Sequence, residues 1–596
     1  MNRYRRGYVF GAVTVLFNNG IWILGPLAIR GAVDDLQGWH DGKLPASVMP
    51  HKLLIWALLL VLIVAMKGIF QFLTRWVMIG ISRDIEFDLR NDLFAHLERL
   101  SYSYYQRMRT GDIMARATND LNAVRNLLGP GIMYTANTLV LSAFALAIMI
   151  KISPRLTLYT YAPLPFLSIV VQYFGRRIHE RFERIQASFS DISARAQENF
   201  SGARIVRAFA QEEAEVASFE TANQEYIRRS LKLVRLMGML WPTLEFVLGL
   251  AVVLVLWLGG REVLKGHITV GSFVAFNTYM VQLTWPIIAL GWVINIFQRG
   301  TASMVRIQDI FNQKPEVADA PPPAAAQSAV AASSLVGADD VGQRSAPEIR
   351  GELEFRNLSF GYNGTSVLRD VNLKIPAGSS LAIVGPTGSG KSTLVSLIPR
   401  VYDAPEGAIL LDGRPIRDFP LAWLRRNIGF VPQETFLFSD TVRENIAFGV
   451  ESSSDGDVVQ AAQGANIASE IQAFPEKYNT MVGERGITLS GGQKQRTAIA
   501  RALIRDPRIM VLDDALSSVD TYTEEKILNH LREVMRGRTT IFISHRVSTV
   551  RNADRIAVLH DGSIVELGTH EELLALNGYY TDLYNKQLLE EELETV

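Results

Sequence analysis

The residues with the clearest chemical purpose lie together in one glycine-rich stretch. It reads Gly385-Pro386-Thr387-Gly388-Ser389-Gly390-Lys391-Ser392-Thr393. An apolar run at 381–384 precedes it and a helix-like run at 394–398 follows, so it joins a buried strand to a helix start. Such a turn leaves several backbone N–H groups aimed at one point, with the helix dipole behind them. Lys391 adds a cation for the β- and γ-phosphates, and the Ser392 hydroxyl is placed to ligate Mg²⁺. The spacing therefore predicts a phosphate-binding loop.

Further polar residues before and after this loop lie next to apolar runs. They are Tyr362 in Phe360-Gly361-Tyr362, Gln433 in Phe430-Val431-Pro432-Gln433, Leu489-Ser490-Gly491-Gly492-Gln493, Asp513-Asp514, Ser517-Ser518-Val519-Asp520 and His545. The runs 509–512 and 540–544 predict strands that deliver Asp513 and His545 at their ends. Taken singly, His545 or Asp520 would more often be structural than functional. The order and spacing of the whole set favour a functional site.

The rest of the chain must supply the elements that position these residues. With 596 residues the chain is too long for one core, so two domains or more are expected. Apolar residues make up 48% of it, and the excess is concentrated before residue 300 in runs long enough to span a bilayer. The formal net charge of zero gives no reason to expect a nucleic-acid partner. The absence of cysteine excludes disulfides and cysteine-ligated metal sites.

Six apolar segments are candidate membrane spans, each near the length of about 20 residues that a crossing needs. They cover residues 7–31, 53–79, 129–151, 156–175, 238–259 and 269–297. The connections after the second and fourth are about 50 to 60 residues long and keep apolar residues on one helical face. The middle spans are therefore predicted to continue beyond the membrane as helical hairpins, with turns near Gly111 and Gly202.

The orientation of the chain follows from its basic amino terminus, which carries Arg3, Arg5 and Arg6. The positive-inside rule places this end in the cytoplasm. With six crossings, and with ATP supplied inside the cell, both termini and the nucleotide-binding domain are expected to be cytoplasmic. The sequence thus predicts a multi-pass protein of the cell membrane, either an inner or a plasma membrane.

Glu245 is the costliest polar residue among those predicted to lie at membrane depth, because an ionisable group there needs a cavity or a partner. It either marks a substrate path or locks helices together by hydrogen bonds, and the residues leave both interpretations open. Asn18 and Asn19 are expected to lock helices. Lys67 is expected to extend its ammonium group toward an interface.

A stretch rich in Ala, Pro, Ser and Gly separates the two halves of the chain and includes Pro321-Pro322-Pro323. Such a composition cannot build a core, so it predicts a mobile linker. The predicted domains are a transmembrane domain at 1–314, the linker at 315–350, a nucleotide-binding domain at 351–585 and an acidic tail at 586–596.

Residues 351–585 resemble the nucleotide-binding domain of the ATP-binding cassette (ABC) superfamily, because every motif given above occurs in that family's order. The segment Thr480–Gly486 resembles one that ABC exporters carry. The first half resembles the membrane domain of six-span exporters through Tyr104-Tyr105, Thr110-Gly111-Asp112, Arg116, Asp120, Glu198-Asn199, Gly202, Arg207 and Phe209. The resemblance implies an all-α six-span transmembrane domain fused to an α/β P-loop nucleotide-binding domain. One chain is then a half-transporter that works with a second one.

The resemblance also implies how ATP is bound. Tyr362 stacks on the adenine, a contact that needs no base specificity. The loop residues Gly385, Pro386, Thr387, Gly388, Ser389, Gly390, Lys391, Ser392 and Thr393 hold the phosphates. Ser490, Gly491, Gly492 and Gln493 bind the γ-phosphate of the nucleotide on the partner subunit.

Metal binding and catalysis are implied for a smaller set. Ser392, Gln433 and Asp513 hold Mg²⁺, with Asp513 acting through Ser392 and water. Gln433 also touches the attacking water, and His545 contacts the γ-phosphate. Asp514 takes the position of the catalytic base.

Asp514 departs from the family pattern, which has glutamate at this position. Aspartate is one methylene shorter, so its carboxylate sits roughly 1 Å or more away, which can cost on the order of 10²-fold in rate. The substitution is similar to that in the degenerate half of heterodimeric exporters. Those chains keep an intact signature, the motif that Leu489–Gln493 forms here, and this chain keeps it too. A heterodimer is favoured, and a homodimer with two slow sites is the alternative.

The sequence as a whole predicts ATP-driven export of a small lipophilic or amphipathic substrate, such as a drug, a lipid or a peptide, through the lipid bilayer. The six apolar runs exclude a soluble ABC ATPase of DNA repair or translation. An ATP-gated channel, or a regulatory subunit with a weakly hydrolysing site, is the alternative function. No single substrate is selected, because exporter cavities lined by apolar and aromatic side chains accept many ligands.

Overall fold

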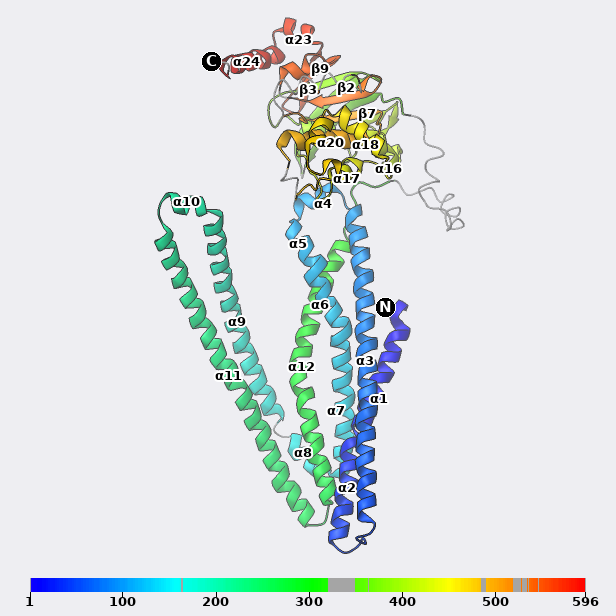
Figure 1. The fold of residues 1–596 in the computed structure, drawn as a ribbon, viewed down its shortest axis with the longest axis vertical. Coiled ribbons are helices and arrows are strands. Elements are labelled where there is room, and N and C mark those ends of the chain that lie inside the picture. The colour runs from blue at the N-terminus through cyan, green and yellow to red at the C-terminus, as the bar shows by residue number, and fades with distance from the viewer. Residues whose placement is uncertain are drawn as a thin grey trace, which may run out of the picture. The chain divides into compact units, whose positions relative to one another are not determined.

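The computed structural model describes residues 2–161, 164–319, 349–362, 364–483, 489–517, 527, 533, 535–544 and 546–594. The chain divides into two compact units. Unit 1 comprises Met1–Ala95 and Gly111–Asn312, and unit 2 comprises His96–Thr110 and Gln313–Val596. Figure 1 draws the helices and strands of both units. Each unit has its own core, so each is described separately.

Within the described residues, the regular elements of unit 1 are all helices or helical turns. They are α1 (Arg5–Trp22), α2 (Leu24–His40), α3 (Met49–Arg99), α5 (Thr110–Ala115), α6 (Leu121–Asn126), α7 (Ile132–Ile152), α8 (Pro154–Tyr161), α9 (Leu164–Ser201), α10 (Ala203–Ala208), α11 (Glu212–Leu264) and α12 (Val270–Phe311), with a 3-10 turn at Asn2–Tyr4 and π-helical turns at Arg116–Asp120 and Leu127–Gly131. The long helices follow the six predicted spans. Among the described residues, α1–α2, α3, α5–α7 and α11 are long and apolar enough to cross a membrane.

The two predicted hairpins turn close to the expected glycines. α9 and α11 run side by side as far as α10, and Gly202 separates α9 from α10 (Figure 1). In the other hairpin α3 ends at Arg99, and Gly111 lies in the first turn of α5. Between them, α4 (Tyr102–Arg107) forms the turn itself.

The residues around α4 pack in unit 2, whereas the sequence analysis assigned all of 1–314 to the first domain. Two interactions explain the difference. Arg107 Nη2 lies 2.7 Å from Glu316 Oε1, and the Ser101 hydroxyl accepts a hydrogen bond from the Val317 N–H at 2.9 Å. The turn is therefore held by the chain that follows α12.

The first predicted span is interrupted between α1 and α2, and this break lies in the core of unit 1. Pro26 has no N–H to donate to the Trp22 carbonyl, so the helix ladder is interrupted between α1 and α2. The buried Tyr279 hydroxyl donates to the Ile23 carbonyl at 2.6 Å. A residue of α12 thus satisfies a carbonyl at the break and fixes α12 against the first span.

Several polar side chains of unit 1 bind one another between helices. The Asn19 amide donates to Asn137 Oδ1 at 2.6 Å, and the Lys67 ammonium lies 4.0 Å from the centroid of the Trp22 ring. Lys67 therefore makes a cation–π contact, although the sequence suggested only that it reaches an interface.

Glu245 is exposed on α11 and makes no hydrogen bond or ion pair with any described residue.

Unit 2 contains two sheets. The smaller has the order β2-β1-β4-β5 and is formed by β1 (Leu353–Tyr362), β2 (Thr365–Ile375), β4 (Ile409–Leu411) and β5 (Arg414–Pro415). The larger has the order β10-β9-β3-β8-β7-β6 and is formed by β3 (Ser380–Val384), β6 (Ile428–Val431), β7 (Ile509–Asp513), β8 (Thr539–Ile543), β9 (Arg555–His560) and β10 (Ser563–Gly568). β9, β3, β8, β7 and β6 are parallel, and β10 is antiparallel to β9. Their near-continuous apolar residues agree with strands covered on both faces.

Helices complete unit 2. They are α15 (Lys391–Ser396), α16 (Leu421–Arg426), α17 (Val442–Ala447), α18 (Asp455–Gly464), α19 (Ala468–Ala473), α20 (Gly491–Leu503), α22 (Val547–Val550), α23 (His570–Leu576) and α24 (Tyr579–Glu594). α17 to α20 share an apolar core of their own with β6 and β7. The expected domain end at 585 falls inside α24, so 586–594 continue a helix. Most of the expected linker, 320–348, lies outside the described residues.

Candidate functional site

Three of the predicted motifs lie at one edge of the larger sheet. β3, β8, β7 and β6 are parallel neighbours, so their carboxyl ends meet at the same edge. The phosphate-binding loop follows β3, and Asp513 is the last residue of β7. Gln433 lies two residues beyond the end of β6. Ligands of parallel α/β sheets bind at this edge.

Glycine is required at two positions of the loop. Gly385 has φ of 149°, and a Cβ there would lie 2.0 Å from the Leu559 carbonyl oxygen. Gly390 has φ of 99° and is the N-cap of α15. A side chain at either position would force the loop out of its turn, so the sequence pattern is explained by backbone geometry.

Lys391 is buried within the loop that precedes it. Its Nζ donates to the carbonyl oxygens of Gly385 at 2.9 Å and Pro386 at 2.8 Å. Burial lowers the pKa of Lys391, while the nearby carboxylates of Asp513 and Asp514 act in the opposite direction. The ammonium group thus lies between the carbonyl oxygens of the loop and the carboxylates at the end of β7.

Ser392 and Asp513 form the second polar pair of the site. The Ser392 hydroxyl donates to Asp513 Oδ1 at 3.0 Å, and Asp513 is 4% exposed. A hydroxyl and a carboxylate are hard oxygen ligands of the kind Mg²⁺ takes. The pair joins the helix after the loop to the end of β7, as the sequence predicted.

Asp514 lies directly beside this pair with an unusual backbone. The φ of Asp514 is 48°, and its N–H donates to the Ile543 carbonyl at 3.1 Å. The Ser517 hydroxyl donates to the Asp514 carbonyl at 3.0 Å. A left-handed conformation is uncommon outside glycine, but aspartate tolerates it better than most residues. The neighbouring strand thus fixes the backbone that carries this carboxylate.

Tyr362 ends β1, and its hydroxyl donates to Thr393 Oγ1 at 3.2 Å. Its ring lies edge-on to Tyr402, with 5.1 Å between the ring centroids. Burial raises the pKa of Tyr402 to about 12. Sequence analysis missed Tyr402, because it lies 40 residues from Tyr362 and no local pattern links the two rings.

The signature segment begins α20. Ser490 is its N-cap, and a reciprocal capping box joins Ser490 to Gln493. The Gln493 amide nitrogen also donates to Glu470 Oε2 at 3.0 Å, and Glu470 pairs with Arg496. Gln493 was expected to bind nucleotide, but its side chain here stabilises its own helix. Ser490 and Gly491 are exposed.

Other predicted residues are only partly placed. Gln433 is exposed beyond β6, at the sheet edge. His545 and Ser518–Asp520 lie outside the described residues, as do the last residues of the segment 480–486, from 484 on. Of that segment, the Val482 N–H donates to the Asp440 carbonyl at 2.9 Å.

An ion pair between the buried Asp120 and the half-exposed Arg306 gives a structural role in unit 1 to one residue that the exporter resemblance named. Asp120 is 8% exposed and accepts hydrogen bonds from Arg306 Nε and the Ser303 hydroxyl, each at 2.8 Å. The bond from Arg306 holds the pKa of Asp120 below its ordinary value. The pair fixes the π-helical turn at Arg116–Asp120 to α12.

Both units match known proteins. Residues 8–287 match the ABC transporter transmembrane region, and residues 368–517 match the family described as ABC transporter. MdlA of Escherichia coli, a multidrug resistance-like ATP-binding protein, is 36% identical over 98% of this chain and 95% of its own length. An ATP-dependent lipid A-core flippase of Syntrophus aciditrophicus is 38% identical over 90% of this chain and 86% of its own.

The solved structures include a bacterial Atm1-family ABC exporter with ATP bound. It matches this structure with a TM-score of 0.76 at 31% sequence identity, and the match covers 98% of each chain. The similarity therefore extends over the helical half, the nucleotide-binding half and their order in one chain.

Proposed function

The chain belongs to the ABC transporter family, and from this premise we propose that it is one half of a dimeric exporter for a small lipophilic or amphipathic compound. It combines a helical transmembrane domain with an α/β nucleotide-binding domain and uses ATP to drive export. We infer that one position of its own ATP site is impaired and that its partner is a different half-transporter.

The observation that carries this proposal is the convergence of three side chains at the sheet edge. Lys391 Nζ is held at the loop carbonyls, and the Ser392 hydroxyl donates to Asp513 at 3.0 Å. In the proposed site Lys391 neutralises the β- and γ-phosphates of ATP, while Ser392 and Asp513 hold Mg²⁺. The metal ion supplies positive charge against the phosphate oxygens.

The proposed ATP site is completed by residues of both subunits. Tyr362 stacks on the adenine, and Gln433 and His545 act at the attacking water and the γ-phosphate. Ser490 and Gly491, exposed at the start of α20, supply N–H groups to the nucleotide held by the partner subunit. Gln493 acts in that proposal by fixing the cap of α20.

The substrate class is supported by the relatives and by one residue. The relatives are named for multidrug resistance and for lipid A-core flipping, which concern lipophilic or amphipathic compounds. Glu245 lies on the exposed face of α11 with no partner among the described residues, which favours a cavity-facing role over a helix-locking role. We assign it to the substrate path.

The proposed orientation places the nucleotide-binding domain and both chain termini in the cytoplasm. The basic residues Arg3, Arg5 and Arg6 at the amino terminus support it, because cytoplasmic segments next to membrane spans carry an excess of Lys and Arg.

Uptake into inverted membrane vesicles tests this function. Vesicles from cells that express the chain together with any neighbouring half-transporter reading frame are given ATP and a panel of lipophilic fluorescent compounds. At least one compound should accumulate with ATP, and accumulation should stop in Lys391→Ala vesicles. A panel that enters wild-type and Lys391→Ala vesicles equally would contradict the proposed substrate class.

A further inference from the structure

A cleft lined by basic residues lies between α9 and α11, on the part of the hairpin that leads toward α10. Its volume is about 810 Å³. Six cations line it: Arg177, Arg181, Arg184, Arg229, Lys232 and Arg235. Only two carboxylates share the lining. The ATP site does not use these residues, and no motif of the sequence predicted them as a group.

One of the two carboxylates of the cleft, Glu225, already forms ion pairs with neighbouring arginines. Glu225 Oε1 lies 2.7 Å from Arg229 Nε, and Glu225 also pairs with Arg228 on the same helix. Arg229 reaches across the hairpin as well, because its Nη1 donates to the Ser188 hydroxyl at 2.7 Å. Arg229 thus holds α9 and α11 together, and its pair with Glu225 leaves little charge for a ligand.

Four other cations of the cleft are not balanced in this way. Arg181 and Arg184 on α9, and Lys232 and Arg235 on α11, make no ion pair with a carboxylate of any described residue. Each pair is three residues apart on one helix, where like charges destabilise each other. An anion in the cleft would remove that repulsion from both helices at once.

The floor of the cleft is apolar. Leu236 and Met239 belong to its lining and stand at the start of the strongly apolar part of α11, which is among the segments able to cross a membrane. At the other helix, the Arg177 guanidinium lies 5.5 Å from the ring centroid of Tyr173. Basic and aromatic side chains at the end of an apolar run are typical of the membrane–water interface.

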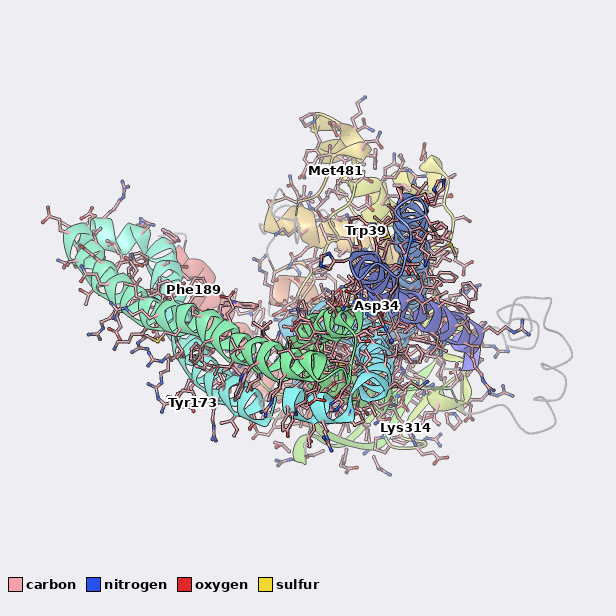
Figure 2. The ribbon with its side chains drawn as sticks, turned by 90° about the horizontal axis from the view of Figure 1, so that it is seen from below. Asp34, Trp39, Tyr173, Phe189, Lys314 and Met481 are labelled. Carbon is pink, nitrogen blue, oxygen red and sulfur yellow. The ribbon has the colours of Figure 1, made fainter. Side chains whose placement is uncertain are left out.

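Figure 2 labels Tyr173 and Phe189, the aromatic residues of α9 that precede and follow the cationic positions along the helix. Phe189 in turn lies 6.2 Å from the Tyr226 ring of α11, between ring centroids. The buried Ile185 and Leu233 pack between the helices in the same stretch. The cleft is thus a polar opening above a packed helix pair, with its apolar floor on the side of the membrane.

We propose that this cleft binds the phosphate headgroup of an anionic membrane lipid, with the acyl chains along the apolar part of α11. One arginine guanidinium group can donate to two phosphate oxygens at once, and Lys232 adds a positive point charge. A soluble phosphate ester shares the headgroup chemistry but leaves Leu236 and Met239 uncovered. The inference rests on the proposed function only in that α9 and α11 cross the membrane with this end in the cytoplasmic leaflet.

Photo-crosslinking of lipid to the full-length transporter tests the proposal. The protein is reconstituted in nanodiscs of phosphatidylcholine that carry a photoactivatable phosphatidylglycerol, and the labelled peptides are mapped. Labelling should fall on α9 and α11 around residues 177–239. The double variants Arg181→Gln/Arg184→Gln and Lys232→Gln/Arg235→Gln should each require about 30-fold more phosphatidylglycerol for equal labelling, since each basic residue at a membrane surface contributes about 1 kcal/mol.

The matched control is Arg195→Gln/Arg204→Gln, which removes two arginines from the same hairpin outside the cleft. It should label like the wild type. ATP hydrolysis in pure phosphatidylcholine should be unchanged in all three variants, which shows that they fold. The labelling reads lipid contact directly, so it is independent of whether the proposed substrate class is right.

Two results would overturn the proposal. Equal labelling of the cleft by a photoactivatable phosphatidylcholine, or labelling that the cleft variants do not change, would show that the cations do not select an anionic headgroup. Protection of the cleft by glycerol 3-phosphate at the same concentration as phosphatidylglycerol would show that it binds soluble phosphate esters instead.

Discussion

The ring of Tyr102 lies edge-on to the ring of Tyr402, with 6.1 Å between the ring centroids and 71° between the ring planes. Tyr402 lies edge-on to Tyr362 at 5.1 Å. Tyr102 belongs to α4, the turn between α3 and α5, and Tyr362 is the proposed adenine-stacking residue. The Tyr402 ring therefore lies between Tyr102, in a turn connected to the membrane helices, and Tyr362 of the proposed adenine site.

Replacing Tyr102 by Ala should reduce the coupling of ATP hydrolysis to export. An edge-on aromatic pair contributes about 0.5–1.5 kcal/mol. Without it, the equilibrium between α4 packed against Tyr402 and α4 detached from it should shift by up to about tenfold. The measurement is the number of substrate molecules exported for each ATP hydrolysed. Tyr102→Phe keeps the ring and should keep the ratio. An unchanged ratio in Tyr102→Ala would separate this contact from coupling.

Replacing Lys391 by Ala should weaken ATP binding, because it removes the cation beside the phosphates. Hydrogen bonds to charged groups are worth about 1.5–3 kcal/mol, so the affinity should fall about 10- to 150-fold. Titration with a fluorescent ATP analogue measures it. Lys374→Ala, which removes an exposed lysine paired with Glu352 at 3.1 Å, is the control and should bind normally. Equal affinity in the two variants would speak against the assigned phosphate site.

A proline at Glu198 should break α9 one turn before Gly202. A proline within a helix costs about 3 kcal/mol or more, because it removes a hydrogen bond and clashes with the preceding turn. If the hairpin transmits closure of the nucleotide-binding domains, Glu198→Pro should abolish export while nucleotide binding persists. Glu198→Ala keeps the helix and serves as the control. Export at wild-type levels in the proline variant would exclude this hairpin from coupling.

Replacing Asp120 by Asn should destabilise unit 1 in a pH-dependent way. Arg306 holds the pKa of Asp120 low, so the pair contributes stability above the ordinary pKa of about 3.9 and loses it as the pH falls through the lowered value. At pH near 7 the loss should be about 1–3 kcal/mol, since a buried partner of Arg306 is removed. Thermal unfolding in detergent measures it.

The difference in melting temperature between Asp120→Asn and the wild type should shrink in acid. Asp112→Asn, an exposed aspartate of α5, is the control and should unfold like the wild type at every pH. A constant difference across the pH range would mean that the charge of Asp120 contributes nothing.

The sequence predicted the parts of the site that depend on neighbouring residues. A glycine-rich stretch between an apolar strand and a helix start predicts a turn, and the structure has that turn between β3 and α15. Asp513 was placed correctly because a carboxylate at the end of a buried strand must lie at the sheet edge. The six helical stretches followed from apolar length alone.

Contacts between distant residues could not be predicted in this way. Asp34 accepts hydrogen bonds from the Gly271 N–H at 2.9 Å and the Thr269 hydroxyl at 3.1 Å, and so fixes the start of α12 from α2. Nothing in the sequence pattern joins residues more than two hundred positions apart. The motif at Gln493 likewise gave no sign that this side chain caps α20, and its contact with nucleotide stays a prediction.

We propose that this chain supplies a weak catalytic position and an intact signature to an exporter whose other half is a different chain. The pairing of Asp514 with Ser490 and Gly491 motivates it, since a general loss of function should have changed both. The partner should then carry Glu after its Mg²⁺-binding Asp, together with an altered signature. Steady-state ATP hydrolysis by the assembled transporter tests the claim in two variants.

Asp514→Asn should leave most ATP hydrolysis, because that site already contributes little. Gly491→Asp should abolish most of it, because it puts a negative charge against the γ-phosphate of the partner's site. In a heterodimer of this kind the two variants should therefore differ strongly in ATP hydrolysis. If the chain purified alone formed a symmetric dimer that hydrolysed ATP briskly and lost that activity in Asp514→Asn, the heterodimer proposal would be contradicted.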